Sequence, residues 1–362
     1  MNQEKVSFRK VISYSGAFIA LLIGSGFATG QEVMQYFASF GLKGIFGTIT
    51  ALILLSYVGM SFITTGYRER FEKGNDIYYY ICGNKVGAFY DYFSIFFIFL
   101  SVTVMISGAG ATGSQHYNWP NFAGGLLMGI CAILTVILGL NRIVDVIGNI
   151  GPVIVIISIV VAVITLFKFG DQLSAGSIEV QEIVARGEIK QASTNWFLAA
   201  GSYVGFCMLW LAAFLAQVGK SANSNKEAKL GGFGGALGFS VAVLLLALAL
   251  ISQITELQGS QIPSLILAGE ISPLLANIFS VIIFLGIYTT SVPLLWTVVS
   301  RFSEEGTSKF RLLTVVVGAV AVIIGLNIQF DTLVNIVYVL NGYLGMILLL
   351  FMIYRSITEK RL

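Results

Sequence analysis

Charged residues are scarce in this sequence, and their scarcity excludes most soluble proteins. Only 11% of the 362 residues are Asp, Glu, Lys or Arg, whereas 56% are hydrophobic. A soluble domain carries about 25% charged residues, so a fold of this length cannot cover its surface with so few of them. The composition therefore excludes a water-soluble enzyme, a disordered chain and a nucleic-acid-binding protein, and it indicates a polytopic membrane protein.

Residues that bind metals or carry out catalysis are also few. His116 is the only histidine, which excludes a histidine-based metal site. The cysteines Cys82, Cys131 and Cys207 lack C-x-x-C spacing and lie in or beside apolar runs, as packing residues do. No Walker motif is present, so we do not expect ATP to drive the protein. We predict no enzymatic activity, no catalytic residues, no metal site and no organic cofactor.

Long apolar runs occupy most of the chain. A membrane-spanning helix needs about 20 apolar residues, and these runs are continuous instead of alternating, which argues against a barrel. We predict ten spans, at residues 8–39, 42–67, 86–113, 121–140, 143–167, 194–218, 229–254, 272–302, 311–329 and 332–355. The predicted fold class is therefore an all-α polytopic membrane protein with ten transmembrane helices.

The lysines and arginines predict the orientation in the membrane. If the N-terminus is cytoplasmic and the chain crosses ten times, only four of the 21 basic residues lie outside, namely Lys43, Lys168, Arg186 and Lys190. Positive residues collect on the cytoplasmic side of membrane proteins. We therefore predict a multi-pass protein of the cell membrane with both termini in the cytoplasm.

The sequence also contains signs of an internal duplication. The first span holds residues 24–27 (GSGF), and the sixth holds residues 201–206 (GSYVGF), about half the chain later. Five helices per half is an odd number, so the second half would cross in the opposite direction, as in many secondary transporters. The predicted units are a first repeat at 1–170, an external connecting loop at 171–193, and a second, inverted repeat with a short cytoplasmic tail at 194–362.

Glycines in the middle of a span favour a broken helix. Glycine is about 1 kcal/mol less favourable than alanine in a helix. A break at Gly24 and Gly26 would leave backbone carbonyls and amides that only a cavity or a ligand satisfies at membrane depth. The alternative is a close helix contact through small residues, but the matching glycines of the sixth span favour two breaks. The predicted substrate-binding residues are Gly24, Ser25, Gly26, Phe27, Gly201, Ser202, Tyr203 and Phe206.

Three further sequence patterns are an aromatic face, a glycine-rich segment and a long stretch between spans. Tyr203, Phe206 and Trp210 share one face of the sixth span, where they would line an apolar part of the substrate or pack in the core. Residues 231–235 (GGFGG) at the start of the seventh span indicate a close-packing surface. The long external stretch 169–193 predicts either a short interfacial helix or a solvated loop.

Glu32 follows the first predicted break and is an acidic residue deep inside a span. A charged side chain in a bilayer is costly, so an intramembrane carboxylate indicates a function. Glu32 would carry a proton or act as a gate at the outer vestibule. The alternatives are a hydrated carboxylate or a charge in the first turn of the second half-helix.

Oxygen atoms of the eighth span predict a cation site. Pro293 lacks an N–H group, which frees the Thr289 carbonyl, and Thr290 and Ser291 add hydroxyls near the Ile287 carbonyl. A hard cation such as sodium binds several oxygen atoms. With carbonyls of the first span, the predicted ion-binding residues are Ala20, Ile23, Ile287, Thr290 and Ser291. The alternative is that both hydroxyls bond back within a kinked helix.

These motifs resemble a known family. Residues 23–32 (IGSGFATGQE), the glycines of 201–205 and the Thr290-Ser291 pair are similar to those of the amino acid–polyamine–organocation superfamily. That superfamily has the leucine-transporter fold of five plus five inverted helices with broken first and sixth helices. Within it, the chain resembles the uncharacterised YkvI-like bacterial membrane proteins. The resemblance implies a secondary transporter whose substrate binds between the two broken helices.

The resemblance also implies how the ligands are held. In sodium-coupled members an amino-acid carboxylate meets amides that correspond to Ser25 and Gly26, and a sodium ion lies between the first and eighth spans. Phe27 stands where members with a second sodium have a polar side chain, so we do not expect a second sodium. We therefore predict an ion-coupled secondary transporter of a small organic solute, an amino acid or similar zwitterion, driven by Na+ or H+ through alternating access.

A receptor subunit that senses an amino acid without transporting it is the alternative, because the superfamily contains both kinds of protein. The predicted partners are the lipid bilayer and the small-molecule substrate, with no nucleic acid.

Overall fold

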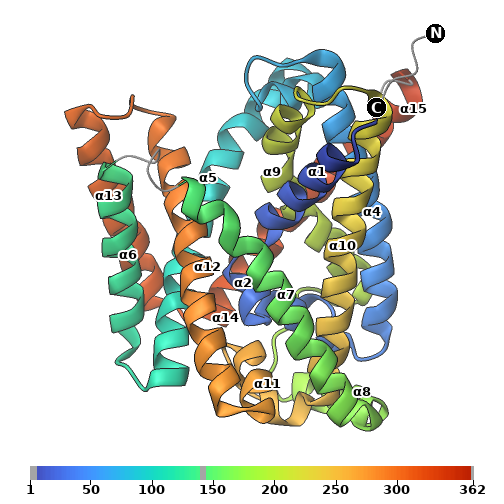
Figure 1. The fold of residues 1–362 in the computed structure, drawn as a ribbon, viewed down its shortest axis with the longest axis vertical. Coiled ribbons are helices and arrows are strands. Elements are labelled where there is room, and N and C mark those ends of the chain that lie inside the picture. Colours follow the sequence, from blue (N-terminus) through green and yellow to red (C-terminus); the bar gives the residue numbers. More distant parts are fainter. Residues whose placement is uncertain (1–5, 139–143, 360–362) are drawn as a thin grey trace.

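The computed structural model describes residues 6–138 and 144–359, and all regular structure in these ranges is helical (Figure 1). The longer helices are α1 (Phe8–Leu22), α4 (Lys43–Glu69), α5 (Asp76–Tyr117), α6 (Asn121–Leu138), α7 (Val144–Phe169), α8 (Leu173–Ala185), α9 (Trp196–Gly219), α10 (Asn225–Ser252), α11 (Pro263–Ile271), α12 (Pro273–Ser300), α13 (Ser308–Asn327) and α15 (Val339–Glu359). The short elements are α2 (Ser25–Thr29), α3 (Gln31–Tyr36), η1 (Ala38–Phe40), η3 (Gly170–Gln172), η4 (Ile254–Leu257), α14 (Phe330–Leu333) and the π-helical η5 (Val334–Tyr338). The all-α prediction is confirmed for the described residues.

Eight helical stretches of the described chain are long and apolar enough to cross a membrane. They include α4, α5, α9, α10, α12 and α13, together with the stretch from α7 into α8 and the stretch from α14 through α15. A shorter apolar helix corresponds to α6, and the first predicted span is divided among α1, α2 and α3. Each predicted span coincides with helical structure, although residues 139, 140 and 143 at the ends of two spans lie outside the described ranges.

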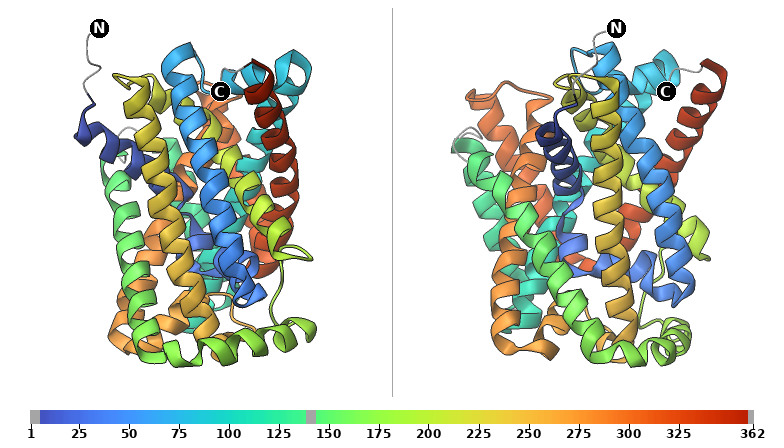
Figure 2. Two further views of the ribbon diagram at one scale, coloured as in Figure 1. Left: turned by 90° about the vertical axis from the view of Figure 1, so that its right-hand side faces the viewer. Right: turned by 45° about the vertical axis from the view of Figure 1, so that its right-hand side comes forward.

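The two ends of the helical bundle are distinct. α1 begins and α15 ends near one end of the molecule, whereas α8 and α11 lie at the opposite end (Figures 1 and 2). An even number of crossings places both ends of a chain on the same side of a membrane, and the observed arrangement agrees with this. The end with α8 and α11 is the side predicted to be external.

Two elements differ from the predicted boundaries. α5 begins at Asp76, ten residues before the predicted start, and it bends at Gly83, which has φ 71° and ψ −179°. Glycine tolerates this positive φ, so the helix changes direction there before it enters the spanning part. The stretch predicted to be external, residues 169–193, contains the helix α8, which exposes Ile178 and buries Val180 and Ile183. The structure therefore favours a helix over a plain loop in this stretch.

Glycines allow the central helices to approach closely. α10 packs against both α1 and α4. A Cβ atom at Gly232 would lie 2.7 Å from the carbonyl oxygen of Gly59, and one at Gly235 would lie 2.6 Å from the Cβ of Phe18. Small residues at helix interfaces permit such close packing in membranes. The predicted packing surface at residues 231–235 is confirmed.

The predicted break in the sixth span is wrong, because α9 is one continuous helix. Its glycines instead fit against α15. A Cβ atom at Gly205 would overlap the carbonyl oxygen of Gly342, and one at Gly201 would lie 3.0 Å from the terminal methyl of Met346. The close α9–α15 contact and the intact helical hydrogen bonds outweigh a penalty of about 1 kcal/mol for each glycine.

Candidate functional site

The first span is broken at its centre, as predicted. α1 ends at Leu22, and Gly24 is extended, with φ −103° and ψ −167°. The amide of Gly24 donates to the Leu22 carbonyl at 3.1 Å instead of continuing the helical pattern to Ala20. The carbonyl of Ala20, a half-buried residue, therefore loses its usual helical donor.

A second break, which the sequence reasoning missed, separates α2 from α3. Gly30 adopts φ 82°, and its amide donates to the Phe27 carbonyl at 3.0 Å. A Cβ atom at Gly30 would lie 3.1 Å from the Ser264 amide nitrogen, so a larger residue would also push α11 away. The signal in the sequence was a third glycine shortly after the first two. Because the chain turns twice, α3 folds back towards α2.

Glu32 lies directly against Gly26. A Cβ atom at Gly26 would overlap the Oε1, Cδ and Cγ atoms of Glu32, so the carboxyl group occupies the space that any other side chain would fill. Glu32 is 1% exposed, and neither carboxylate oxygen has a hydrogen-bond partner among the described residues. The residue lies in the first turn of α3, which was one of the predicted alternatives. Its carboxyl group is nevertheless buried and receives no hydrogen bond from the described chain.

No ion pair in the described ranges neutralises Glu32. Ion pairs found there include Arg186–Glu188, Lys190–Asp331 and Arg301–Asp91, and none of these involves Glu32. An isolated buried carboxylate is strongly unfavourable. The site therefore requires a proton, a metal cation or the cationic group of a ligand beside Glu32.

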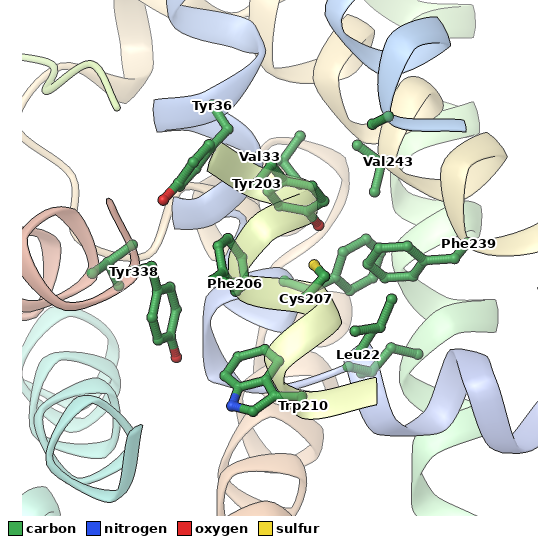
Figure 3. Close-up of a cluster of buried hydrophobic side chains, with 14 of the residues drawn as sticks. Leu22, Val33, Tyr36, Tyr203, Phe206, Cys207, Trp210, Phe239, Val243 and Tyr338 are labelled. Carbon is green, nitrogen blue, oxygen red and sulfur yellow. The ribbon is translucent and has the colours of Figure 1, made fainter. Parts of the chain in front are cut away.

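Aromatic side chains gather beside the broken span (Figure 3). The ring of Tyr36 on α3 lies 5.3 Å from that of Tyr203 and 5.5 Å from that of Phe206 on α9. Phe206 stacks on Tyr338 of η5 at 4.8 Å, and the Tyr338 ring lies 5.4 Å from that of Trp210. The predicted aromatic face of α9 thus points into the bundle, towards α3 and η5.

Two of these aromatic residues carry buried polar atoms without a partner. Within the part of the chain that the structure describes, the Tyr203 hydroxyl and the Trp210 indole nitrogen make no hydrogen bond. Unpaired buried polar atoms are rare in proteins. Their concentration here identifies the region between the first span and α9 as the candidate site.

The predicted residues of the sixth span have different neighbours. Gly201 lies against α15, and the Ser202 hydroxyl donates to the Val339 carbonyl at 3.3 Å. Tyr203 and Phe206 pack against Tyr36 of α3.

The predicted residues of the first span also have different neighbours. The Phe27 ring lies 5.5 Å from that of Phe239 on α10, which in turn lies 6.4 Å from the Tyr203 ring. Gly24 faces α5, because a Cβ atom there would lie 2.9 Å from the terminal methyl of Met105. Phe239 and Met105 were not predicted, because nothing in a single sequence indicates which residues of α5 and α10 reach the break.

The predicted ion-binding hydroxyls form hydrogen bonds within α12. Ser291 donates to the Ile287 carbonyl at 2.7 Å, and Thr290 donates to the Gly286 carbonyl at 2.9 Å. These are the bonds of the alternative interpretation. They use the hydroxyl protons and leave lone pairs on both oxygen atoms for a cation. α12 packs against α2, the short helix that begins two residues after Ile23.

A polar network that the sequence reasoning missed joins α3 to the end of the molecule with α8 and α11. Gln35 is fully buried, and its amide nitrogen donates to the Asp331 carbonyl at 2.8 Å. Asn335 donates to the Gln35 side-chain oxygen at 2.9 Å. Lys190 binds the Asp331 carboxylate and, at 2.7 Å, the Thr332 hydroxyl. The network ties α3, the segment before α9 and the start of the last span together on the predicted external side.

A polar cavity of about 240 Å³ lies at the same end, between α5, the segment before α11 and the turn from α13 to α14. Hydrogen bonds hold its walls: Ser107 donates to the Ile328 carbonyl at 2.9 Å, and the Phe330 amide donates to the Gln261 side chain at 3.0 Å. Its position makes it a candidate outer vestibule.

Comparisons with known proteins agree with this architecture. No model of a known protein family matches the chain. In sequence, the chain is similar to the uncharacterized membrane protein YkvI of Bacillus subtilis (strain 168), with 22% identity over 329 residues that cover 91% of each protein. It is also similar to the uncharacterized protein YyaD of the same strain, with 27% identity over 343 residues that cover 94% of this chain and 95% of YyaD.

Solved structures show the same fold at low sequence identity. MhsT in complex with L-phenylalanine matches with a TM-score of 0.59 and 16% identity, over 95% of this chain and 88% of MhsT. Inward-facing Mhp1 matches with a TM-score of 0.58 and 15% identity, over 97% of this chain and 77% of Mhp1. A substrate-bound, outward-open Na+-coupled sialic acid symporter matches with a TM-score of 0.56 and 14% identity, over 93% and 74% of the two chains. The predicted resemblance to YkvI-like membrane proteins with a leucine-transporter type of fold is confirmed.

Proposed function

We propose that this protein is an ion-coupled secondary transporter, and not an enzyme, that moves a small organic solute across the bacterial cytoplasmic membrane by alternating access. The observation that carries the proposal is the doubly broken first span, which buries the unpaired Glu32 carboxyl group against Gly26, one helical turn before Tyr36 of the aromatic cluster. Irregular backbone and unpaired charges persist at membrane depth where they line a pathway or bind a ligand. The fold shared with a Na+-coupled sialic acid symporter supports this function.

The substrate class is proposed to be an amino acid or a similar zwitterion. Amino acids are the class that the resemblance implies, and MhsT, which shares the fold, has been solved with L-phenylalanine. The substrate would lie between the broken first span and the aromatic face of α9. The residues proposed to line or support this site are Gly24, Ser25, Gly26, Phe27, Gly201, Ser202, Tyr203 and Phe206. Of these, Gly201 would act indirectly, because it fits α9 against α15.

The architecture of the proposed transporter has ten spans, with α1, α2 and α3 together forming the first. Residues 1–170 and 194–362 would be the two inverted repeats, joined by the external segment 171–193, with both termini in the cytoplasm. The common position of the start of α1 and the end of α15 supports this orientation (Figure 2).

The coupling ion is proposed to be sodium. Its site would be formed by oxygen atoms of Ala20, Ile23, Ile287, Thr290 and Ser291, between the first break and α12. The freed Ala20 carbonyl and the packing of α12 on α2 support this location. In a proton-coupled alternative, Glu32 would carry the proton, and Glu32→Gln would remove the pH dependence of transport while sparing the response to sodium.

Uptake into proteoliposomes tests the proposal. Purified protein would be reconstituted, and uptake of a panel of labelled amino acids and amines would be measured with an inward sodium gradient, with an inward proton gradient and with neither. We expect a solute that accumulates only when a gradient is imposed, and no accumulation in protein-free liposomes. Binding without uptake under any gradient would instead identify a receptor.

A further inference from the structure

A groove that the proposed transport function does not use lies between α6 and α12, and α6 forms one edge of the molecule (Figure 1). The volume of the groove is about 470 Å³, within the range of roughly 300–1,000 Å³ that is typical of ligand sites. Its walls are almost wholly apolar and include Leu127 and Met128 of α6 and Phe284 and Leu285 of α12. Burying a charged or strongly polar group in it would be costly, so the groove suits a hydrocarbon.

The groove opens onto the surface that faces the bilayer. Leu127, Leu134 and Leu285 line it and are exposed. α12 is long and apolar enough to cross a membrane, and α6 is a shorter apolar helix beside it. Apolar side chains exposed on such helices lie against lipid and not against water. The groove is therefore continuous with the interface that this polytopic protein makes with the bilayer.

The length of the groove matches one leaflet. Along α6 the lining extends from Gly124 to Thr135, and eleven residues of α-helix rise by about 16 Å. The hydrocarbon core of a bilayer is about 30 Å thick, so one leaflet contributes about 15 Å. A spanning helix from a second copy of the chain would need a contact along the whole thickness. A groove of half that length fits one lipid chain better.

The two ends of the groove differ as the two ends of a lipid chain do. At one end, the Trp119 ring lies 5.2 Å from the Tyr117 ring and 5.9 Å from the Phe284 ring. Trp and Tyr side chains are enriched at the depth of the lipid headgroups. At the other end, a hydrogen bond of 2.7 Å pairs the Thr135 and Tyr288 hydroxyls with each other.

The end with Trp119 is on the side predicted to be external. Gln115, four residues earlier, donates to the Ser260 hydroxyl at 3.0 Å, just before α11. We propose that the groove binds one hydrocarbon chain of a phospholipid of the outer leaflet, with the headgroup beside Trp119 and the end of the chain near Thr135. The bound chain packs on α6 and α12 together and so stabilises the folded protein. This inference goes beyond the proposed transport function and does not depend on it.

The number of lipids that stay bound tests the site. Full-length protein would be reconstituted in nanodiscs of dioleoyl phosphatidylglycerol, released into a mild detergent and weighed by native mass spectrometry. Cys131 lines the groove, so Cys131→Trp would fill it with an indole ring. Ile130→Trp is the matched control, because it adds the same ring at the neighbouring exposed position of α6, outside the groove. We expect Cys131→Trp to retain one lipid fewer than the unmodified protein, and Ile130→Trp to retain the same number.

Thermal unfolding gives a second measurement, since a ligand that binds the folded state raises its melting temperature. Dioleoyl phosphatidylglycerol should raise the melting temperature of the unmodified protein and of Ile130→Trp, and its apparent affinity for Cys131→Trp should be at least ten-fold weaker. Dihexanoyl phosphatidylglycerol has the same headgroup on chains too short to fill the groove, and it should give no comparable rise. Met128→Trp fills the groove from a neighbouring position and replaces Cys131→Trp if that variant fails to fold. The comparison of the two chain lengths needs no variant.

Several results would overturn the inference. They are an undiminished lipid count in Cys131→Trp, an equal loss of lipid in Cys131→Trp and Ile130→Trp, and an equal effect of the two chain lengths on the unmodified protein. A dimer mass that is seen with the unmodified protein and lost in Cys131→Trp would also overturn it and would assign the groove to a second copy of the chain. None of these results alters the outcome expected in the uptake assay, so the proposed transport function is tested separately.

Discussion

Replacing Gly26 with alanine is expected to force Glu32 out of its position. The new Cβ atom would overlap three atoms of the Glu32 side chain, which is 1% exposed and so has to repack inside the bundle. Inserting a methyl group into a packed interior costs about 1–3 kcal/mol, and a displaced rotamer adds about 0.5–1.5 kcal/mol. We therefore expect Gly26→Ala to lower the free energy of unfolding by roughly 2–4 kcal/mol.

Two other glycines of the first span provide matched controls. A Cβ atom at Gly24 would lie 2.9 Å from the terminal methyl of Met105, the far end of a flexible side chain that can move at little cost. A Cβ atom at Gly16 would have no neighbour within 4 Å. Gly24→Ala should therefore be mild, and Gly16→Ala should be neutral or stabilising by up to about 1 kcal/mol, because alanine is the better helix former.

A double variant assigns the effect of Gly26→Ala to its cause. Glu32→Ala removes the three overlapping atoms, so Gly26→Ala combined with Glu32→Ala should recover most of the lost stability. In double-mutant cycles, residues in contact commonly show coupling energies of about 0.5–3 kcal/mol.

The assay is thermal unfolding of the purified variants in one detergent, with size-exclusion chromatography to confirm that each is folded. The expected order of melting temperatures places Gly16→Ala highest, then the unmodified protein, then Gly24→Ala, with Gly26→Ala lowest. Two results would show that Glu32 does not lie against Gly26 and that the description of the site is wrong. One is a melting temperature of Gly26→Ala equal to that of Gly24→Ala. The other is a double variant, Gly26→Ala with Glu32→Ala, that regains none of the stability lost in Gly26→Ala.

Three further predictions address the ion site, the helix packing and the topology. Joint replacement of Thr290 and Ser291 by alanine should weaken the sodium dependence of transport at least ten-fold, since each lost ligand to a charged group costs about 1.5–3 kcal/mol. Thr297→Ala is the control: it removes another α12 hydroxyl, which donates to the Pro293 carbonyl about two turns after the proposed ion site, and it should leave the sodium dependence unchanged. Gly205→Ala should reduce the yield of folded protein, because its Cβ atom would overlap the backbone of α15, which cannot move aside cheaply. A cysteine at Ile178, which is 71% exposed on α8, should react with an impermeant thiol reagent in intact cells, and labelling only after permeabilisation would contradict the orientation.

The helical membrane architecture was predictable because it depends on composition over long windows. Twenty apolar residues in a row have few alternatives to a spanning helix, and the predicted spans coincide with helices throughout the described chain. The break at Gly24 was also predictable, since two glycines around Ser25 weaken a helix locally. Both features depend on residues that are close together in the sequence.

The same local reasoning failed at Gly201 and Gly205. These glycines have the spacing of a helix break, but α9 is continuous because α15 approaches so closely that only glycine fits there. A glycine pair in a span therefore has two meanings, a weak helix or a close neighbour. The choice between them depends on which helix lies opposite, and that helix is distant in the sequence.

By itself, the sequence determined that the chain is helical, where its membrane-spanning segments lie, and that a carboxylate stands shortly after a weak point in the first of them. These properties follow from hydrophobicity and helix propensity, which act over a few turns of chain. Only the tertiary structure decided that the second break at Gly30 folds Glu32 back onto Gly26 and packs Tyr36 against Tyr203. That arrangement depends on the approach of α9 and α11 to a twice-broken span, and contacts between such distant segments are set by packing across the whole bundle.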